Sequence, residues 1–220
     1  MKILIVAATR FEIQPLISHL GAILNSENKY IRCSYKNLEV DTLVTGIGMA
    51  ATAYYVGKQL NSGYNFVINA GICGSFNNNL PVGAVVNVIE DCFSELGAED
   101  GNNFFSLEEL NLEGNSKFLN TNFTLSNSII ELLPKVNGIT VNTVHGNDKS
   151  IEKTVHKFHP IVESMEGAAF MLACEAENVP YMQLRAVSNY VERRNKENWN
   201  IPLAIKALNE KIIEILNAFE

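Results

Sequence analysis

The feature that most constrains the fold is an uninterrupted apolar run directly after Met1 and Lys2. Residues 3–8 read Ile-Leu-Ile-Val-Ala-Ala, with no polar residue at alternate positions. A strand with one face in water alternates apolar and polar residues, so this run is typical of a strand buried on both faces. It indicates a parallel sheet that helices cover on both sides.

Strand and helix patterns alternate along the rest of the chain. One helical face is formed by Ile13, Leu16, Ile17 and Leu20, and Gly21 is well placed to end that helix. Further strands are expected at 38–45, 66–70, 85–89, 139–144 and 181–187, and further helices at 49–60, 168–176 and from Ile205 to Phe219. Residues 94–125 are weakly periodic and are expected to form an irregular surface excursion. No repeat or linker interrupts the chain, so we expect a single α/β domain over residues 1–220.

The charge and hydropathy of the chain exclude some classes of partner. A net charge of −7 disfavours binding to a nucleic-acid backbone, which requires clustered Lys and Arg side chains. No apolar run approaches the roughly 20 residues of a membrane span, and the N-terminal run is too short for a signal peptide. We therefore expect a cytoplasmic protein with no nucleic-acid partner and no membrane partner.

Cysteine and histidine spacing gives no sign of a metal site. The four cysteines are Cys33, Cys73, Cys92 and Cys174, and no two of them have C-x-x-C spacing. We expect buried free thiols in a reducing cytosol. The histidines at 145, 156 and 159 do not have the spacing of metal ligands either, and we expect neither a metal nor a cofactor.

Polar or glycine-rich segments follow three of the predicted strands, at residues 8–12, 69–74 and 185–189. In open α/β sheets, ligands gather beyond the carboxyl ends of the strands. A fourth segment, 163–169, places an acidic residue before a helix, where the helix dipole favours a carboxylate. Taken singly, each feature has a structural explanation, since such residues are also ordinary first-turn acids and turn residues.

Taken together, these segments resemble the purine nucleoside phosphorylase and nucleosidase superfamily. The resemblance is carried, in order, by the glutamate-containing stretch 7–13, Thr45-Gly46-Ile47-Gly48, Asn69-Ala70-Gly71, Ser164-Met165-Glu166-Gly167-Ala168-Ala169 and Arg185-Ala186-Val187-Ser188-Asn189. It runs from about residue 1 to residue 219, and the pattern is most similar to the nucleosidase branch. The resemblance implies a three-layer fold with a central mixed, twisted β-sheet flanked by helices. It also implies a homodimer and a small-molecule nucleoside substrate.

The resemblance implies a role for each of five residues. Glu12 matches the glutamate that activates the attacking water, and Met165 and Glu166 match the pair that holds the ribose. Gly74 matches a glycine whose backbone meets the nucleoside, and Asn189 matches the position that meets the purine at N7. These roles suit the chemistry, because cleavage of the C1′–N9 bond builds positive charge on the sugar and negative charge on the base.

Asn189 departs from the aspartate that adenine-specific members of the family carry. An amide donates to O6 and accepts from a protonated N7, so it suits a 6-oxopurine, and a mismatched base would leave buried polar groups unpaired. Within the branch this resembles the futalosine hydrolases, which release hypoxanthine from futalosine and leave dehypoxanthine futalosine in menaquinone biosynthesis. The carboxybenzoyl group of futalosine would find a cationic partner in Arg193 or Arg194, which are otherwise a solvated basic pair.

Three other functions remain open. A purine nucleoside phosphorylase for inosine or guanosine would also favour an amide at the base, but Glu12 would place a negative charge beside its phosphate. A methylthioadenosine/S-adenosylhomocysteine nucleosidase shares the motifs, and a non-catalytic nucleoside-binding protein shares the fold. The segment 145–149 lacks an aromatic residue that would stack on the purine; Tyr190 is an alternative, and we assign no stacking residue.

Overall fold

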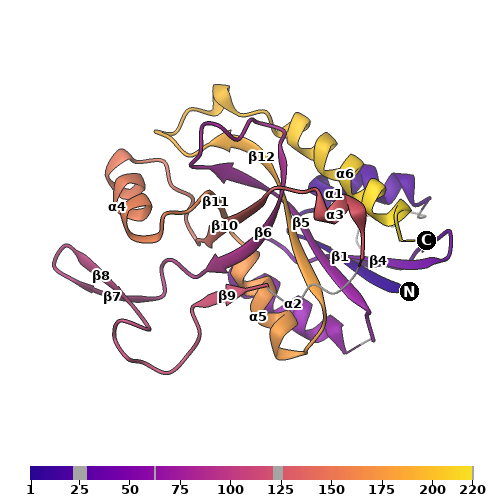
Figure 1. Ribbon diagram of the computed structural model, residues 1–220, viewed down its shortest axis with the longest axis horizontal. Helices are drawn as coiled ribbons and strands as arrows, with labels where there is room; N and C mark the ends of the chain where they lie inside the picture. Colours follow the sequence, from indigo (N-terminus) through magenta and orange to yellow (C-terminus); the bar gives the residue numbers. More distant parts are fainter. Residues whose placement is uncertain (22–28, 62, 121–125, 220) are drawn as a thin grey trace.

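The computed structural model describes residues 1–21, 29–61, 63–120 and 126–219, and its centre is a twisted ten-stranded mixed sheet (Figure 1). The strands are β1 (Lys2–Ala7), β2 (Tyr30–Ile31), β3 (Ser34–Tyr35), β4 (Leu38–Val44), β5 (Phe66–Ser75), β6 (Val85–Cys92), β7 (Gly97–Asp100), β8 (Asn103–Ser106), β9 (Lys117–Leu119), β10 (Lys135–Thr140), β11 (Val162–Ser164) and β12 (Tyr181–Tyr190). The helices are α1 (Arg10–His19), α2 (Met49–Leu60), α3 (Ser128–Glu131), α4 (Asp148–Phe158), α5 (Gly167–Ala176), a 3-10 turn η1 (Lys196–Asn198) and α6 (Ile201–Asn217).

The strand order of the main sheet is β11-β10-β6-β12-β5-β1-β4-β2. The central strands β12, β5, β1 and β4 run parallel to one another, whereas β12 pairs antiparallel with β6 and β11 pairs antiparallel with β5. The carboxyl ends of the parallel strands therefore meet at one edge of the sheet, with β11 crossing beside β5.

Helices cover both faces of this sheet, as Figure 1 shows: α1, α3 and α6 lie on one side and α2 and α5 on the other. Alternate residues of β1 enter the two cores. Ile3 and Ile5 pack in the core beneath α1 and α6, and Leu4 and Val6 pack in the core beneath α2 and α5. The prediction of a three-layer fold around a strand buried on both faces is confirmed.

Most of the elements expected from periodicity are present, and α2 has the predicted bounds. The strand expected at 139–144 was placed too late, since β10 ends at Thr140. Beyond it the backbone leaves the sheet, and the N–H of Asn142 donates to Oε2 of Glu95 (2.8 Å) instead of to a neighbouring strand. Helix α4 was not predicted, although Ile151, Val155 and Phe158 lie at helical spacing; the helix buries none of its residues fully.

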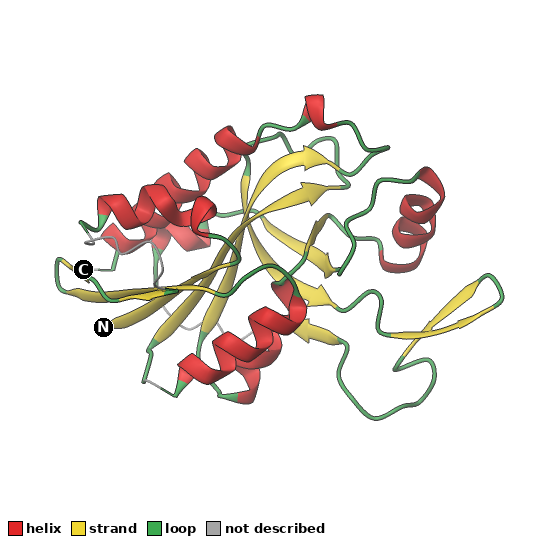
Figure 2. Cartoon of the chain, turned by 180° about the vertical axis from the view of Figure 1, so that it is seen from behind, coloured by secondary structure: helices red, strands yellow, loops and turns green. Residues whose placement is uncertain are grey.

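The irregular excursion at 94–125 contains three short strands. Strands β7 and β8 form a hairpin that projects from the body of the molecule (Figure 2), and β9 returns to pair with β6. The hairpin is exposed along β7. Residues 121–125 of the predicted excursion lie outside the described residues.

The remaining sequence expectations concern membranes, thiols and metals. In the described parts of the chain, every helix is too short or too polar to cross a bilayer. All four cysteines are free thiols, as predicted; Cys73 and Cys174 are buried and the other two are half-buried. Among the described residues, no three His, Cys, Asp or Glu side chains form a group that could hold a metal ion.

Candidate active site

The predicted site residues gather at the carboxyl ends of β5 and β12. These strands pair in parallel, with Gly71 opposite Arg185 and Gly74 opposite Asn189. The sequence placed both glycines after a strand that ended at residue 70, which was wrong: β5 continues through them to Ser75. It does so because β12 and β11 pair with this part of β5 from both sides.

Glu12 lies in the first turn of α1 and is buried, with 7% of its surface exposed. Its Oε2 accepts hydrogen bonds from the backbone N–H and the hydroxyl of Thr9, each at 2.9 Å, in a capping box. Its Oε1 accepts from the backbone N–H of Ile72 at 3.2 Å. The structural explanation of Glu12 as a first-turn acid is therefore correct, and the same bonds hold its carboxylate against β5.

Glu166 is the N-cap residue of α5, and its Oε1 accepts from the backbone N–H of Gly48 at 3.1 Å. Burial raises the pKa of Glu166, with a smaller contribution from the charge of Glu12, while Arg185 and the Gly48 N–H act in the opposite direction. The two acids and the arginine therefore share one electrostatic environment. Met165 is half-buried in the turn just before Glu166.

Arg185 was not given a role from the sequence, yet it is the largest fully buried side chain. Its Nε donates to Oε1 of Gln183 at 3.0 Å, and Nη2 donates to Oδ1 of Asn69. A β-carbon added to Gly71 would overlap Arg185 Nη1 and would lie 3.2 Å from Glu12 Oε1. The guanidinium and the Glu12 carboxylate thus both border the space beside the Gly71 α-carbon. The available signal was a charged residue within the apolar run of β12, because a buried arginine needs partners.

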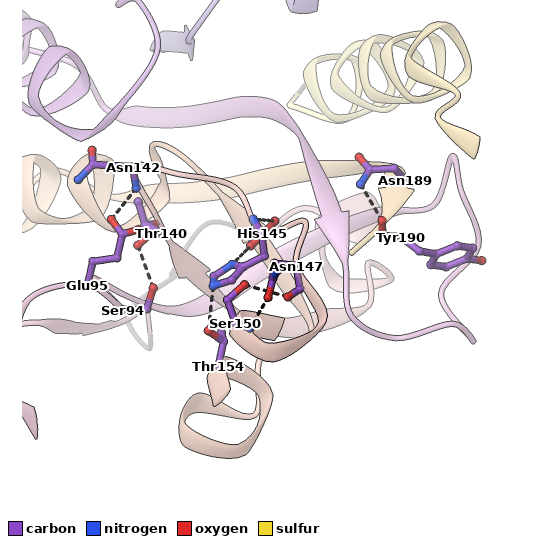
Figure 3. A network of polar contacts seen from close by, with 11 residues as sticks. Ser94, Glu95, Thr140, Asn142, His145, Asn147, Ser150, Thr154, Asn189 and Tyr190 are labelled. Atoms are coloured by element: carbon purple, nitrogen blue, oxygen red, sulfur yellow. Dashed lines mark hydrogen bonds and ion pairs between the residues drawn. The ribbon is translucent and has the colours of Figure 1, made fainter. Parts of the chain in front are cut away.

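Asn189 lies at a β-bulge, since the register of β12 against β5 shifts between Val187 and Asn189. Its Oδ1 accepts from the Ser188 hydroxyl at 2.8 Å, and its Nδ2 donates to the Tyr190 carbonyl at 2.9 Å (Figure 3). An amide has two N–H groups and two oxygen lone pairs, so each end retains the capacity for one further bond.

Gly74 is closely surrounded by side chains beside this amide. A β-carbon at Gly74 would lie 2.8 Å from Val191 Cγ2, 3.4 Å from Asn189 Nδ2 and 3.5 Å from Glu163 Cγ. The amide and Glu163 therefore flank Gly74 from the two neighbouring strands. Any larger residue at this position would fill the space next to Asn189.

The segment between β10 and α4 forms the other side of the Gly74 region, and His145 anchors it. Glu163 accepts from the His145 backbone N–H at 3.1 Å, and its Oε2 lies 2.6 Å from His145 Nδ1. The other ring nitrogen lies 2.8 Å from the Thr154 hydroxyl, and Figure 3 shows these contacts together. Because both ring nitrogens have protein partners, the expectation that His145 is structural is supported.

Other candidates from the sequence lie outside this cluster. The ring of Tyr190 points away from the Asn189 amide in Figure 3, and its hydroxyl donates to the Asn78 carbonyl at 3.4 Å. Arg193 and Arg194 are exposed, and the Arg194 guanidinium lies 5.2 Å from the centre of the Trp199 ring.

The site has two chemically different ends. Glu12, Glu166 and Arg185 lie at the end near Gly71, and the Asn189 amide lies at the end near Gly74, beside the hydrogen-bonded side chains of Glu163 and His145. Three residues of extended β5 separate them, which is about 10 Å. This arrangement suits a ligand with hydroxyl groups at one end and a heteroaromatic ring at the other, and it can deprotonate a water molecule at the hydroxyl end.

Known proteins resemble the chain in sequence and in fold. A family model described as the phosphorylase superfamily matches residues 2–219. A futalosine hydrolase of Acidothermus cellulolyticus is 32% identical over 175 residues, covering 76% of this chain and 71% of that protein. A 5′-methylthioadenosine/S-adenosylhomocysteine nucleosidase of Glaesserella parasuis is 27% identical over 235 residues, covering 100% of both. A solved futalosine hydrolase of Helicobacter pylori shares the fold, with a TM-score of 0.81 at 18% identity over 99% of this chain and 97% of that one.

Proposed function

The chain belongs to the phosphorylase superfamily, and on that premise we propose that it is a nucleosidase that hydrolyses the N-glycosidic bond of a 6-oxopurine nucleoside, with futalosine as its substrate. The products would be hypoxanthine and dehypoxanthine futalosine, in menaquinone biosynthesis. The observation that carries the proposal is that the Glu12 carboxylate and the Arg185 guanidinium both border the space beside Gly71, which brings a buried base and a buried cation into one region of the site.

Glu12 is the general base in this proposal. Its carboxylate takes a proton from a water molecule while the water oxygen bonds to C1′ and the C1′–N9 bond breaks. Positive charge that develops on the ribose is stabilised by the two nearby carboxylates. Glu166 accepts hydrogen bonds from the 2′- and 3′-hydroxyls, next to Met165, which packs against the sugar.

In this proposal Asn189 recognises the leaving base, and the backbone of Gly74 meets the nucleoside. The amide oxygen accepts from the protonated N7 of hypoxanthine, and the amide nitrogen donates to O6. An amide does not release a proton at neutral pH, so the proton gained at N7 comes from solvent. Adenine carries an amino group at C6, which is a hydrogen-bond donor and would face the N–H donor of the Asn189 amide. This mismatch supports discrimination against adenine.

Phosphorolysis is the second candidate reaction. An attacking phosphate would have to lie beside the Glu12 carboxylate, and the Arg185 guanidinium is already bonded to Gln183 and Asn69. Those bonds favour water over phosphate. Adenine nucleosidase activity is the third candidate, because the chain matches the whole length of a methylthioadenosine/S-adenosylhomocysteine nucleosidase.

The reaction class is tested by measuring purine release from futalosine, inosine and methylthioadenosine, each with and without phosphate. We expect hypoxanthine release from futalosine without phosphate. Release from inosine that requires phosphate would establish a phosphorylase instead, and release of adenine from methylthioadenosine would show that the base assignment is wrong. Binding without release in all cases would identify a nucleoside-binding protein.

We further propose that the protein is a cytoplasmic homodimer. Exposed apolar side chains gather around α2 and α5, namely Ile47, Tyr54, Leu96 and Leu172. Beside them lies an apolar hollow of about 350 Å³ lined by both helices together with Phe93 and Leu96. Such a surface favours a second copy of the chain. Sedimentation equilibrium is expected to give twice the chain mass of 24.4 kDa, and a monomer at micromolar concentration would contradict the proposal.

A further inference from the structure

Asp91 is a buried carboxylate on β6 with no assigned role, and both of its oxygens accept hydrogen bonds from side chains. Oδ1 accepts from the Thr140 hydroxyl and Oδ2 accepts from Nε2 of Gln183, each at 2.9 Å. Only 1% of Asp91 is exposed. These two bonds begin two chains of contacts that lead to different parts of the candidate active site.

The first chain leads to Arg185. Since Nε2 of Gln183 donates to the carboxylate, its amide oxygen is turned the other way and accepts from Arg185 Nε at 3.0 Å. The guanidinium lies directly against the Gly71 α-carbon, on the side of β5 that the Glu12 carboxylate also approaches. The charge on Asp91 therefore fixes which way the Gln183 amide faces, and that amide fixes the arginine.

The second chain leads to Glu166. The Thr140 hydroxyl, which donates to Asp91, also accepts the backbone N–H of Ala168 at 2.7 Å. Ala168 is in the first turn of α5, two residues after Glu166, the N-cap residue. A β-carbon added to Gly167 would overlap both Asp91 and Gln183, so this turn of α5 lies directly against the carboxylate.

We propose that Asp91 is a positioning residue that orients Arg185 through Gln183 and Glu166 through Thr140. This inference rests on the proposed function, because it assigns a purpose to the placement of those two residues at the sugar end of the site. Asp91 does not touch the substrate, and it acts only through these contacts.

A neutral amide cannot replace the carboxylate in this position. Gln183 and Thr140 both donate to Asp91, and an asparagine has only one oxygen to receive them. If the Asn amide nitrogen faced Gln183, the Gln183 amide would have to turn and present a donor to Arg185 Nε. If it faced Thr140, the Thr140 hydroxyl would lose its acceptor. Either arrangement leaves a buried donor unpaired in one of the two chains of contacts.

The pKa of Asp91 agrees with a carboxylate at neutral pH. Burial raises this pKa to about 6, while the bonds from Gln183 and Thr140 and the charge of Arg185 act in the opposite direction. The ionised form therefore predominates at pH 7 and above.

The test compares Asp91→Asn with Asp41→Asn, a matched loss of a buried carboxylate. Asp41 is 3% exposed and accepts from the hydroxyls of Tyr30 and Tyr64, which are outside the candidate site. With futalosine as substrate, we expect Asp91→Asn to lower kcat at least tenfold. Asp41→Asn is expected to lower the melting temperature and to leave kcat within twofold of wild type.

Two further variants separate the two chains of contacts. Gln183→Met removes the link to Arg185 and is expected to lower kcat, whereas Thr140→Val removes the link to α5 and is expected mainly to raise KM. The double variant Asp91→Asn/Gln183→Met should lose no more kcat than Asp91→Asn alone, because both changes act on the same contact. If Asp91→Asn does not fold, Gln183→Met and Thr140→Val still test the two chains of contacts.

Unchanged kcat in Asp91→Asn and Gln183→Met would overturn the inference. So would a double variant in which the two losses of kcat are additive. A crystal structure of Gln183→Met provides a readout that does not depend on turnover. We expect the Arg185 guanidinium to move away from Gly71, and an unmoved guanidinium would overturn the inference. A wild-type protein that cleaves no nucleoside would contradict the proposed function alone, since the position of Arg185 would still be judged from the crystal structure.

Discussion

The Glu12 carboxylate and the Arg185 guanidinium both border the space beside Gly71, although the two residues are 173 positions apart in the chain. A β-carbon at Gly71 would lie 3.2 Å from Glu12 Oε1 and would overlap Arg185 Nη1. Glycine is thus required here because two charged side chains use the space, and its backbone φ is not in the left-handed region.

Gly71→Ala is therefore expected to abolish most turnover. The methyl group would displace a buried arginine, which has no open space to enter, and overpacking of this kind costs about 1–3 kcal/mol of stability. We expect kcat to fall at least 100-fold. Gly57→Ala is the matched control, since Gly57 lies in α2 with nothing within 4 Å of an added β-carbon, and it should be active and about 1 kcal/mol more stable. Normal turnover in Gly71→Ala would show that Arg185 has no part in the reaction.

Glu12→Gln is expected to separate binding from turnover. The glutamine has one amide oxygen, so it can accept from the backbone N–H of either Thr9 or Ile72 but not from both, and it cannot take a proton from water. General base catalysis typically contributes about 10²–10⁴-fold, so we expect kcat to fall by that range with little change in nucleoside affinity measured by calorimetry. Turnover within tenfold of wild type would remove Glu12 from the mechanism.

Asn189→Asp is expected to shift base preference from 6-oxopurines toward 6-aminopurines. One carboxyl oxygen can keep the bond from the Ser188 hydroxyl, but the other would face the Tyr190 carbonyl, where the amide nitrogen now donates. The carboxyl group would therefore take up a proton or turn toward the base. The ratio of kcat/KM for futalosine to that for methylthioadenosine should fall about 10–100-fold. An unchanged ratio would mean that Asn189 does not distinguish the substituents at C6 of the purine.

The pH dependence of stability tests the environment of Asp91. Burial raises the Asp91 pKa from its ordinary value of 3.8 to about 6, so between these values the folded protein holds a proton that the unfolded chain releases. Asp91 therefore makes the free energy of unfolding fall as pH rises through this window, by about 3 kcal/mol in total. The melting temperature of wild type relative to Asp91→Asn should decrease between pH 4 and pH 7, since the pKa shift of Glu166 is common to both proteins. A constant difference would show that Asp91 is not desolvated.

The sequence was most informative where local periodicity reflects the final environment. The run at residues 3–8 predicted β1, and the small-residue segment after Gly48 predicted α2, because burial on two faces or on one helical stripe leaves a direct trace in residue order. Helix α4 also left a trace, in Ile151, Val155 and Phe158 at helical spacing and in its N-cap Asn147, but the segment is short and mostly polar and the pattern was missed.

The site was partly accessible from the sequence. The motifs predicted five site residues: Glu12, Gly74, Met165, Glu166 and Asn189. The structure brings them to the ends of neighbouring elements, and their roles stay predictions. The position of Arg185 over Gly71 depends on the pairing of β12 with β5, which links residues far apart in the chain. The bulge that directs Asn189 also arises only from that pairing, so neither feature follows from local pattern.

The protein is proposed to hydrolyse a 6-oxopurine nucleoside. The most direct test of this activity compares two substrates that differ only at C6. These are futalosine and its 6-amino analogue, measured with wild-type enzyme in phosphate-free buffer. We expect kcat/KM for futalosine to exceed that for the analogue by about 100-fold or more, because the Asn189 amide matches O6 and opposes an amino group. An equal or greater kcat/KM for the 6-amino analogue would contradict the account.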